Sequence, residues 1–309
     1  MTTVRSYSLV SMVALAGLAA CATRTMPPLT TAIVAPLFSS ALEDVGRMER
    51  DTNEARFDVL TSMLTERHIP FVVEPFTIEP RKLEPRTQGR NIVVTIPGRS
   101  PEIVIGAHYD AARLKDGTLS KGAVDNAAST MILVRMAAAL SKVRLRAQTR
   151  IVFFDMEELG LLGSAEFVRA HRDRSMRAMV NLDVNAFGEA LMIGPRTASN
   201  GVALEGALAS CRQLAADCVE FPRMPPTDDI SFQKGGIPAV SIATVPRVQA
   251  HQLWLLVNGG KESGLQPGFT PRVLETIHTP ADASGLVDRT AMERAYRVTV
   301  SLVATLAAH

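Results

Sequence analysis

The chain has few cysteines and almost no excess of charge, and both absences narrow what it can do. Only Cys21, Cys211 and Cys218 are cysteines among its 309 residues, which excludes a disulfide-built scaffold and a cysteine-rich zinc finger. Any metal must therefore be held by nitrogen and oxygen. The chain carries 33 basic and 31 acidic residues, so no electrostatic argument favours a nucleic-acid partner.

The first 35 residues predict an export signal followed by a tether. Arg5 lies in a short polar head, and an apolar run over residues 9–20 leads to Cys21. This run is too short to span a bilayer comfortably, as in a secretory signal. Its Leu-Ala-Ala-Cys ending resembles the bacterial lipobox. We predict a lipoprotein-type signal peptide over residues 1–20 and a Thr-, Pro- and Ala-rich tether over residues 21–35. An ordinary cleaved signal and an uncleaved anchor are the alternatives.

Export has consequences for the location of the domain and for its cysteines. A lipid anchor at Cys21 would hold the domain on a membrane of the bacterial cell envelope, facing the periplasm. In that oxidising compartment Cys211 and Cys218 can form a disulfide. Two buried thiols are the other interpretation.

Helix and strand patterns alternate along most of the chain and indicate an α/β fold. Apolar residues at helical spacing predict one or two surface helices between residues 37 and 67, and residues 71–78 alternate as a strand. Further along, short β-branched runs alternate with apolar helices, which is typical of a parallel sheet covered on both faces. The expected strands are residues 91–97, 102–106, 150–155, 178–182, 190–194 and 238–243, and the expected helices are residues 127–140, 163–171, 202–216 and 290–308.

We therefore predict a mixed, largely parallel central sheet with helices on both faces. It forms a single domain over residues 36–309 that begins with the helical segment. Residues 245–275 fit this scheme least, because they carry Trp254, two adjacent glycines and prolines. We expect a long loop there, and such loops inside compact domains are usually functional or mobile.

Ionisable side chains gather where several of these strands end. The carboxyl ends of the strands of an open α/β sheet are where ligands bind. So many carboxylates at one edge would repel one another unless cations lay among them. The residues at or just after strand ends, or late in the chain beside them, are His108, Asp110, Asp125, Asp155, Glu157, Glu158, Asp183, His278 and Asp282.

Two zinc ions would suit such a set of side chains. Zinc binds histidine nitrogen and carboxylate oxygen, and a catalytic site leaves one position for water. Two zinc ions roughly 3.5–4 Å apart can share a carboxylate and a hydroxide. One carboxylate must then stay off the metal to take the proton from the water. The adjacent pair Glu157 and Glu158 suits this division, because neighbouring side chains point in different directions.

The order of these motifs resembles a known enzyme family. The motifs are His-x-Asp at 108–110, Asp-Asn-Ala-Ala at 125–128, Glu-Glu-x-Gly-Leu-x-Gly-Ser at 157–164, Asn-Leu-Asp at 181–183 and Ile-His-Thr-x-x-Asp at 277–282. Together they resemble the co-catalytic two-zinc aminopeptidases, which include secreted bacterial leucyl aminopeptidases and are related to glutamate carboxypeptidases and glutaminyl cyclases. The resemblance covers about residues 90–309 and implies a zinc exopeptidase-like fold.

The resemblance implies a role for each candidate metal ligand. Asp125 would bridge the two zinc ions. Glu158 and His278 would complete one of them, and His108 and Asp183 would complete the other. Manganese or cobalt also suits a site this rich in carboxylates.

The resemblance also implies which residues support the ligands. Glu157 would be the general base, and Asp110 would accept a hydrogen bond from the second ring nitrogen of His108. Asp282 would act similarly for the turn that carries His278. Close backbone approach favours glycine in the turn after the glutamate pair, where the chain has Gly160 and Gly163.

Two positions depart from the family pattern. Family members commonly have Ser-Asp-His where this chain has Thr227-Asp228-Asp229. The replaced histidine is not a metal ligand in that family, so the change is expected to affect substrate positioning and specificity and to leave the zinc site intact. Asp155 is also more acidic than the small residue often found two positions before the catalytic glutamate.

These inferences predict a metallo-aminopeptidase that cleaves peptide or protein amino termini. A hydroxide that bridges the two zinc ions would attack the scissile carbonyl, with Glu157 as base. A single-zinc glutaminyl cyclase-type transferase and a non-catalytic, lipid-anchored binding protein are the alternatives. A carboxypeptidase would need a cationic clamp for the substrate carboxylate, and no arginine is identifiable as one.

Overall fold

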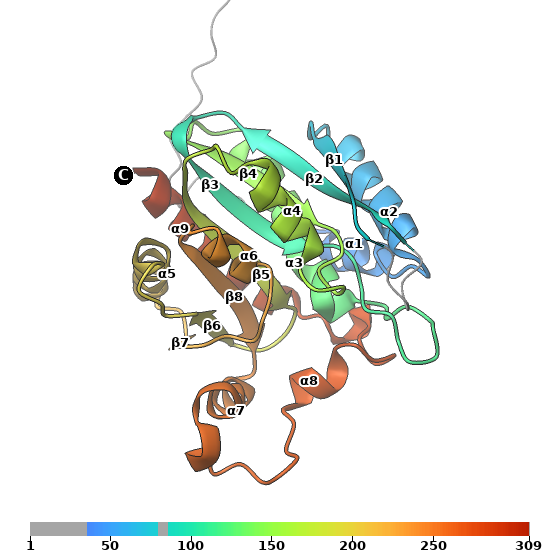
Figure 1. Ribbon diagram of the computed structural model, residues 1–309, viewed down its shortest axis with the longest axis vertical. Coiled ribbons are helices and arrows are strands. Elements are labelled where there is room, and N and C mark those ends of the chain that lie inside the picture. The colour runs from blue at the N-terminus through green and yellow to red at the C-terminus, as the bar shows by residue number, and fades with distance from the viewer. Residues whose placement is uncertain (1–35, 80–85, 309) are drawn as a thin grey trace, which may run out of the picture.

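The computed structural model describes residues 36–79 and 86–308 of the chain. The predicted signal peptide, the tether and Cys21 lie outside these residues. The described chain is built on one eight-stranded sheet with the strand order β1-β2-β4-β3-β5-β8-β6-β7 (Figure 1). Its strands are β1 (Val72–Thr77), β2 (Gln88–Ile96), β3 (Arg99–His108), β4 (Ala147–Phe154), β5 (Met176–Asn185), β6 (Ala190–Gly194), β7 (Cys218–Glu220) and β8 (Ala239–Val245).

Helices cover both faces of this sheet (Figure 1). α3, α5 and α9 pack together over one face, α1 packs on α3, and α4 and α6 form a pair over the other face. The helices are α1 (Ala41–Arg47), α2 (Asn53–Glu66), α3 (Ala128–Leu140), α4 (Leu162–Ala170), α5 (Gly201–Gln213), α6 (Asp229–Lys234), α7 (Arg247–Asn258), α8 (Arg272–Thr276) and α9 (Arg289–Ala308). Short turns of π or 3-10 helix occur at η1 (Ala123–Ala127), η2 (Gly260–Glu262) and η3 (Ser284–Leu286).

The sheet is mixed and largely parallel, as predicted. β3 pairs in parallel with β4 and with β5, β5 pairs in parallel with β8, and β6 with β7. The other three pairings are antiparallel. Parallel strands are buried on both faces and therefore appear in the sequence as continuous apolar runs. This is why β4, buried along almost its whole length, is evident from residues 150–155.

The helix that follows the Asp125 motif is buried on almost all sides. Of the residues of α3, only Ala139 is not buried. Residues Ala123–Leu140 are the one helical stretch in the described part of the chain long and apolar enough to cross a membrane. However, 94% of that stretch is buried inside the fold, which is the environment of a core helix.

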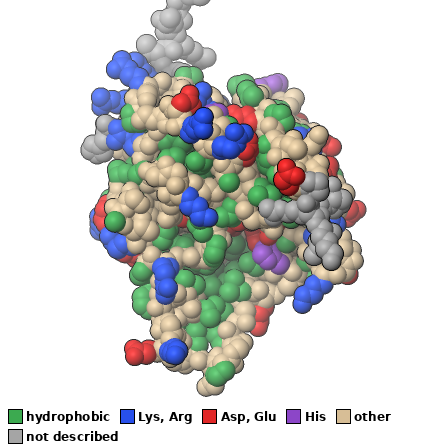
Figure 2. Space-filling view, in the orientation of Figure 1, with side chains coloured by type: hydrophobic (Ala, Val, Ile, Leu, Met, Phe, Trp, Pro, Cys, Tyr) green, Lys and Arg blue, Asp and Glu red, His purple; other side chains and the backbone are tan. Residues whose placement is uncertain are grey.

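The prediction of a long loop over residues 245–275 is wrong. This stretch contains α7, the turn η2 and α8, and it projects from the lower end of the molecule in Figure 1. α7 buries only Ala250 and Leu253, and its apolar residues Val248 and Leu256 are exposed, so it lacks the apolar and polar faces by which a surface helix is recognised in a sequence. The glycines and prolines that disfavour a helix lie at its ends. In Figure 2 apolar side chains gather over this lobe.

The structure also settles how two of the cysteines are arranged. Cys211 on α5 and Cys218 at the start of β7 form a disulfide, so the alternative of two buried thiols is wrong. The bond joins a helix to the edge of the sheet across 7 positions of sequence. The short strand β7 and the helix α6 are absent from the elements that we predict.

Candidate metal centre

The first group of donor atoms is centred on His108. His108 is the last residue of β3, and Asp125 lies in η1, where its φ of −120° and ψ of 87° depart from helical values. Nε2 of His108 is 3.0 Å from Oδ1 of Asp125 and 3.6 Å from Oδ1 of Asp183 on β5. Donor atoms of these three residues all lie within 4.8 Å of one another. The kink in η1 therefore turns Asp125 toward the ends of β3 and β5.

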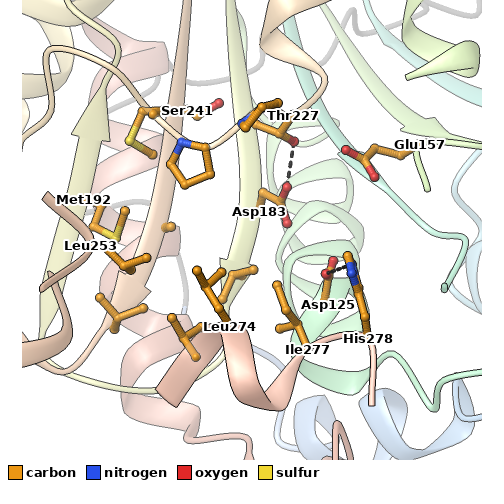
Figure 3. Close-up of a pocket in the computed structure, with 17 residues that line it drawn as sticks. Asp125, Glu157, Asp183, Met192, Thr227, Ser241, Leu253, Leu274, Ile277 and His278 are labelled. Atoms are coloured by element: carbon orange, nitrogen blue, oxygen red, sulfur yellow. Dashed lines mark hydrogen bonds and ion pairs between the residues drawn. The ribbon is translucent and has the colours of Figure 1, made fainter. Parts of the chain in front are cut away.

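The second group of donor atoms is centred on His278. Nε2 of His278 is 3.1 Å from Oδ2 of Asp125 and 3.0 Å from Oε2 of Glu158. The two oxygens of Asp125 thus face different imidazoles, and the two groups share this carboxylate. Figure 3 shows Asp125 beside His278, with Asp183 and Glu157 nearby. The five predicted ligands therefore meet at one place as two overlapping sets.

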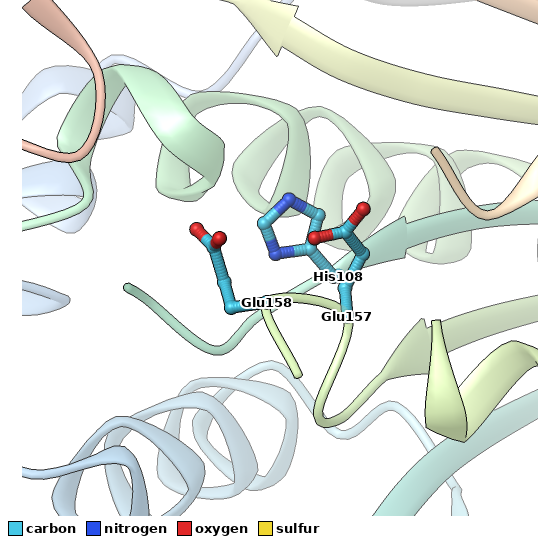
Figure 4. Close-up of side chains that lie close together, drawn as sticks. All are labelled: His108, Glu157 and Glu158. Atoms are coloured by element: carbon cyan, nitrogen blue, oxygen red, sulfur yellow. The ribbon is translucent and has the colours of Figure 1, made fainter. Parts of the chain in front are cut away.

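A tight turn after β4 positions Glu157 and Glu158. Met156 has a left-handed φ of 58°, and the backbone N–H groups of Glu157 and Glu158 donate to Oδ1 and Oδ2 of Asp110, at 3.1 and 3.2 Å. The two glutamate carboxylates lie on different sides of His108 in Figure 4. Burial raises the pKa of Glu157 well above its ordinary value, and such a carboxylate accepts a proton more readily.

The electrostatics of this cluster favour a bound cation. Carboxylates of Asp125 and Glu158 raise the pKa of His278 to about 11, so without a metal a proton is held among them. Burial raises the pKa of Glu158 to about 7, and the Asp125 charge adds to the rise. Oε1 of Glu158 is buried without a hydrogen-bond partner among the described residues. Nitrogen and carboxylate donors in this arrangement fit divalent zinc.

Asp110 lies against Nδ1 of His108, as the resemblance implies, whereas Asp282 supports a different turn from the one expected. Nδ1 of His108 donates to the backbone carbonyl of Asp110 at 3.2 Å, and the Asp110 carboxylate is 3.4 Å away. That carboxylate also accepts from the backbone N–H groups of the Glu157–Glu158 turn. Asp282 accepts from the backbone N–H groups of Val124 and Asp125 at 2.6 and 3.2 Å. It therefore orients the turn of Asp125, and the expectation that it steadies the His278 turn is wrong.

Two supporting residues are missing from our predictions. The hydroxyl of Thr227 donates to Oδ2 of Asp183 at 2.6 Å. The Asn126 side chain donates to the Leu182 carbonyl at 2.9 Å and accepts from the Val184 N–H at 3.2 Å. Asn126 thereby links the Asp125 segment to the strand of Asp183. Asn126 belongs to the motif Asp-Asn-Ala-Ala, so the sequence could have pointed to its supporting role. Thr227 belongs to no motif that would indicate its bond to Asp183.

The structure explains the acidic residue that precedes the glutamate pair. Asp155 is buried and accepts from Nη1 of Arg86 at 2.9 Å and from the backbone N–H of Arg90 at 2.9 Å. Its Oδ1 also accepts from the backbone N–H of Met156 at 2.9 Å. Asp155 is therefore a structural anchor between β2, β4 and the turn that follows.

Both predicted glycines in the turn are required by its backbone. Gly160 has a φ of 103°, a conformation that glycine adopts without strain. A Cβ atom on Gly163 would come within 2.2 Å of the Asp155 carbonyl oxygen. The prediction of close backbone approach is confirmed, because α4 starts directly against the end of β4.

Asp229, which stands where the family pattern has histidine, points away from solvent. It is 1% exposed and its Oδ2 accepts from Nε2 of Gln233. Burial raises the pKa of Asp229 to about 7, against the opposing effect of the Ser241 hydroxyl. Asp229 is therefore a buried acid next to the site, and the negative charge of Asp183 adds to the rise in its pKa.

We expect Asp229→Asn to stabilise the metal-free protein at alkaline pH. The folded-state pKa of about 7 lies above the unfolded value of about 3.9. The folded protein therefore binds more protons between these values and loses stability as pH rises through them. Asparagine removes this loss, so the variant should gain up to about 4 kcal/mol at pH 8 and almost nothing at pH 4. Urea unfolding at pH 4 and at pH 8, in the presence of a chelator, measures the two gains in stability. Asp173→Asn, which changes an exposed residue, is the control. An equal gain at both pH values would contradict the assignment.

An apolar pocket opens beside the cluster (Figure 3). It encloses about 130 Å³, and Asp125, Glu157, Asp183 and His278 form its polar end. Ser241 and Thr227 are its other polar residues. Leu253 of α7 lines the pocket, whereas Trp254 does not. The remaining wall is Val184, Met192, Met224, Pro225, Pro226, Ala243, Val245, Leu253, Val273, Leu274 and Ile277.

Comparisons with known proteins identify a similar sequence and two proteins of similar fold. Aminopeptidase YwaD of Bacillus subtilis is 26% identical over 147 residues, which are 45% of this chain and 31% of that protein. The structure superposes on a glutaminyl cyclase from Porphyromonas gingivalis with a TM-score of 0.68 and 19% identity, covering 87% of this chain and 98% of that one. A Zn-dependent exopeptidase from Parabacteroides distasonis gives a TM-score of 0.66 and 16% identity, covering 90% and 99%.

The two structural matches show a shared fold. The match to a family model shows the family of this chain. The chain spans about half the length, or less, of the curated relatives that it matches. The model of Peptidase family M28 matches residues 91–303, which include all five predicted ligands and Glu157. This chain belongs to Peptidase family M28.

Proposed function

We propose that this protein is a zinc-dependent exopeptidase that hydrolyses the amino-terminal peptide bond of peptides or proteins. The observation that carries the proposal is the pair of donor sets that share Asp125, with Glu157 beside them. Relatives described as aminopeptidases and a fold neighbour described as a Zn-dependent exopeptidase support it.

The residues have distinct roles in holding metal. His108 and Asp183 would hold one ion, Glu158 and His278 the other, and Asp125 would bind both. Bound zinc supplies Lewis-acid polarisation of a carbonyl and a water of lowered pKa. Manganese or cobalt would be accepted by the same oxygen-rich donors.

Glu157 is the group placed to move protons. It lines the pocket beside the donor cluster, and burial raises its pKa, so it can take a proton from the attacking water and give it to the leaving amine. Asp110 holds the turn of Glu157 through two backbone N–H groups. The carboxylates at the site would attract the free amino group of the substrate, which restricts cleavage to the terminus.

The apolar pocket predicts which amino-terminal residues are cleaved best. Its wall is apolar over most of its surface, and burial of a leucine-sized side chain contributes about 1.5–3 kcal/mol. We expect leucyl and methionyl substrates to exceed glycyl and aspartyl ones by about tenfold or more in kcat/KM. Ala243 lines the pocket, so Ala243→Phe should reduce cleavage of leucyl far more than of alanyl substrates.

A panel of aminoacyl chromogenic substrates, combined with measurement of bound metal, tests this proposal. Activity that requires zinc and is lost in a chelator is the expected result. Val202→Ala on α5 changes an exposed residue outside the pocket and serves as the control for Ala243→Phe. Equal cleavage of glycyl and leucyl substrates would contradict the pocket assignment. Protein that binds no metal when zinc is supplied would favour a non-catalytic binding role.

A glutaminyl cyclase-type transferase is the competing activity. The sequence resemblance implies that single-zinc cyclases keep the equivalents of Asp125, Glu158 and His278. In this chain His108 and Asp183 complete a second donor set, which favours hydrolysis. Cyclisation of an amino-terminal glutamine without hydrolysis of leucyl substrates, with one zinc per chain, would overturn the preference.

We also propose that the protein is exported and anchored by a lipid at Cys21. The Leu-Ala-Ala-Cys motif supports this, and the Cys211–Cys218 disulfide is typical of an oxidising compartment. Cells fed a labelled fatty acid should yield labelled wild-type protein and unlabelled Cys21→Ser protein. Label that persists in Cys21→Ser would contradict the anchor.

A further inference from the structure

A buried arginine on α2 contacts two of the loops that carry predicted metal ligands. Arg56 is fully buried and lies outside the stretch matched by the family model, residues 91–303. Its Nε donates to the Tyr109 carbonyl at 2.7 Å, and Nη2 donates to the Gly122 carbonyl at 3.1 Å. Its Nη1 donates to the carbonyls of Met48 and Lys121, both at 2.8 Å. One guanidinium thus satisfies four backbone carbonyls from three segments.

Two of these segments lead directly into metal ligands. Tyr109 stands between His108 and Asp110, and its carbonyl lies on the turn that leaves β3. Gly122 has a left-handed φ of 58° and starts the kinked turn η1, which carries Asp125. Arg56 therefore joins the backbone beside the first imidazole ligand to the backbone that leads to the shared carboxylate.

Neighbouring residues of the same segment make parallel contacts. The side chain of Asn53 donates to the Ala111 carbonyl at 3.2 Å and accepts from the Ala111 N–H at 2.9 Å. Glu49 accepts from the backbone N–H of Ser284 at 2.5 Å, two residues beyond Asp282. The α1–α2 segment is therefore hydrogen-bonded to three loops: the one after β3, the one before Asp125 and the one after His278.

The Arg56 guanidinium is buried and is surrounded by backbone carbonyl groups. All its hydrogen bonds within the described chain end on carbonyl oxygens. Burial lowers the pKa of Arg56 to about 10, and the charges of Asp110 and Asp282 oppose that decrease. The side chain therefore stays cationic at neutral pH. A lysine in its place would keep the charge but has no planar fork to reach all the carbonyls.

We propose that Arg56 is a positioning residue of the metal centre, which fixes the separation of His108 and Asp125 by bonding to the backbone next to each. The inference rests on the metal binding proposed above. It places part of the functional site in the α1–α2 segment, outside the region that the family model matches.

Loss of the Arg56 charge and loss of its hydrogen bonds predict opposite effects on zinc affinity. A buried cation repels a metal ion, so loss of the charge alone would strengthen metal binding. Loss of the four hydrogen bonds would let the two loops move and weaken it. Changes to residues that orient metal ligands typically cost 10- to 100-fold in metal affinity. Weaker binding in an uncharged variant therefore identifies positioning as the role of Arg56.

The experiment is a zinc titration of the full-length chain against a competing chelator. We expect Arg56→Met to bind zinc about 10- to 100-fold more weakly than wild type, and Arg56→Lys to bind more weakly than wild type as well. Arg150→Met is the matched control, since Arg150 is also buried but pairs with Glu102 at 2.6 Å in the amino-terminal half of β4. That variant should lose thermal stability and keep its zinc affinity.

Several results would overturn the inference. The inference is wrong if Arg56→Met binds zinc as tightly as wild type or more tightly. It is also wrong if Arg150→Met loses as much zinc affinity as Arg56→Met, because the loss would then be a general consequence of lower stability. If circular dichroism shows that Arg56→Met is unfolded, Arg56→Lys decides, and wild-type affinity in that variant contradicts the role. Wild-type protein that binds no zinc would refute the proposed function together with this inference, whereas the other outcomes affect Arg56 alone.

Discussion

Replacing Glu157 with alanine is expected to leave the zinc content of the protein unchanged and to lower kcat by about 10²–10⁴-fold. Glu157 lines the pocket and one of its carboxylate oxygens lies within 4.8 Å of donor atoms of His108 and Glu158, but the carboxylate of the neighbouring Glu158 is the one that contacts His278, at 3.0 Å. The change therefore removes the proton acceptor and spares the donors. Metal analysis and steady-state kinetics on leucyl substrates measure the two quantities separately.

Glu158→Ala provides the contrast for this prediction. The two residues are adjacent and their N–H groups bond to the same carboxylate of Asp110, so effects on the turn should be similar. Glu158→Ala should lose zinc together with activity, because it removes a donor of the second set. Full activity in a folded Glu157→Ala protein would refute the role of Glu157 as general base.

Replacing Asp125 with alanine is expected to abolish binding at both positions. Its two oxygens lie 3.0 and 3.1 Å from the two imidazoles, so one substitution removes a donor from each set. The remaining donors at each position would be one histidine and one carboxylate, too few for a zinc site. We expect zinc affinity to fall by more than the 10- to 100-fold typical of residues that only orient ligands.

Thermal unfolding with and without zinc measures this loss directly. A ligand present at 100 times its Kd stabilises the folded state by about 2.7 kcal/mol, and Asp125→Ala should show no such gain. Asp183→Ala is the informative comparison, because Asp183 belongs to the first set alone. That variant should retain one zinc ion. Two zinc ions in folded Asp125→Ala would contradict the shared role of Asp125.

The ligand positions could be predicted from sequence because strand ends are local features. β3, β4 and β5 are buried on both faces and appear as short apolar runs, and the polar residue that follows each run is easy to locate. Parallel pairing then brings those ends to one edge of the sheet. His278 follows no strand, and its place depends on the ordered family motifs.

Helix α7 and the contacts of Asp282 could not be predicted in the same way. Glycine and proline at the ends of α7 make its sequence resemble a loop, and the helix buries only Ala250 and Leu253, too few residues to give a helical pattern. The residue that Asp282 supports depends on which backbone N–H groups lie within reach, and these belong to Val124 and Asp125, more than 150 positions away. No local pattern encodes such a contact.

The sequence by itself determined the class of fold, the candidate donors and the candidate base of this protein, because burial pattern and ligand chemistry are properties of residue types in order. Only the tertiary structure decided how these groups are held. Arg56 looks like a surface charge on an amphipathic helix, yet it is fully buried. Its role depends on four carbonyls that come together only after the chain has folded. Backbone groups are the same at every residue, so a sequence cannot reveal which of them a side chain will meet.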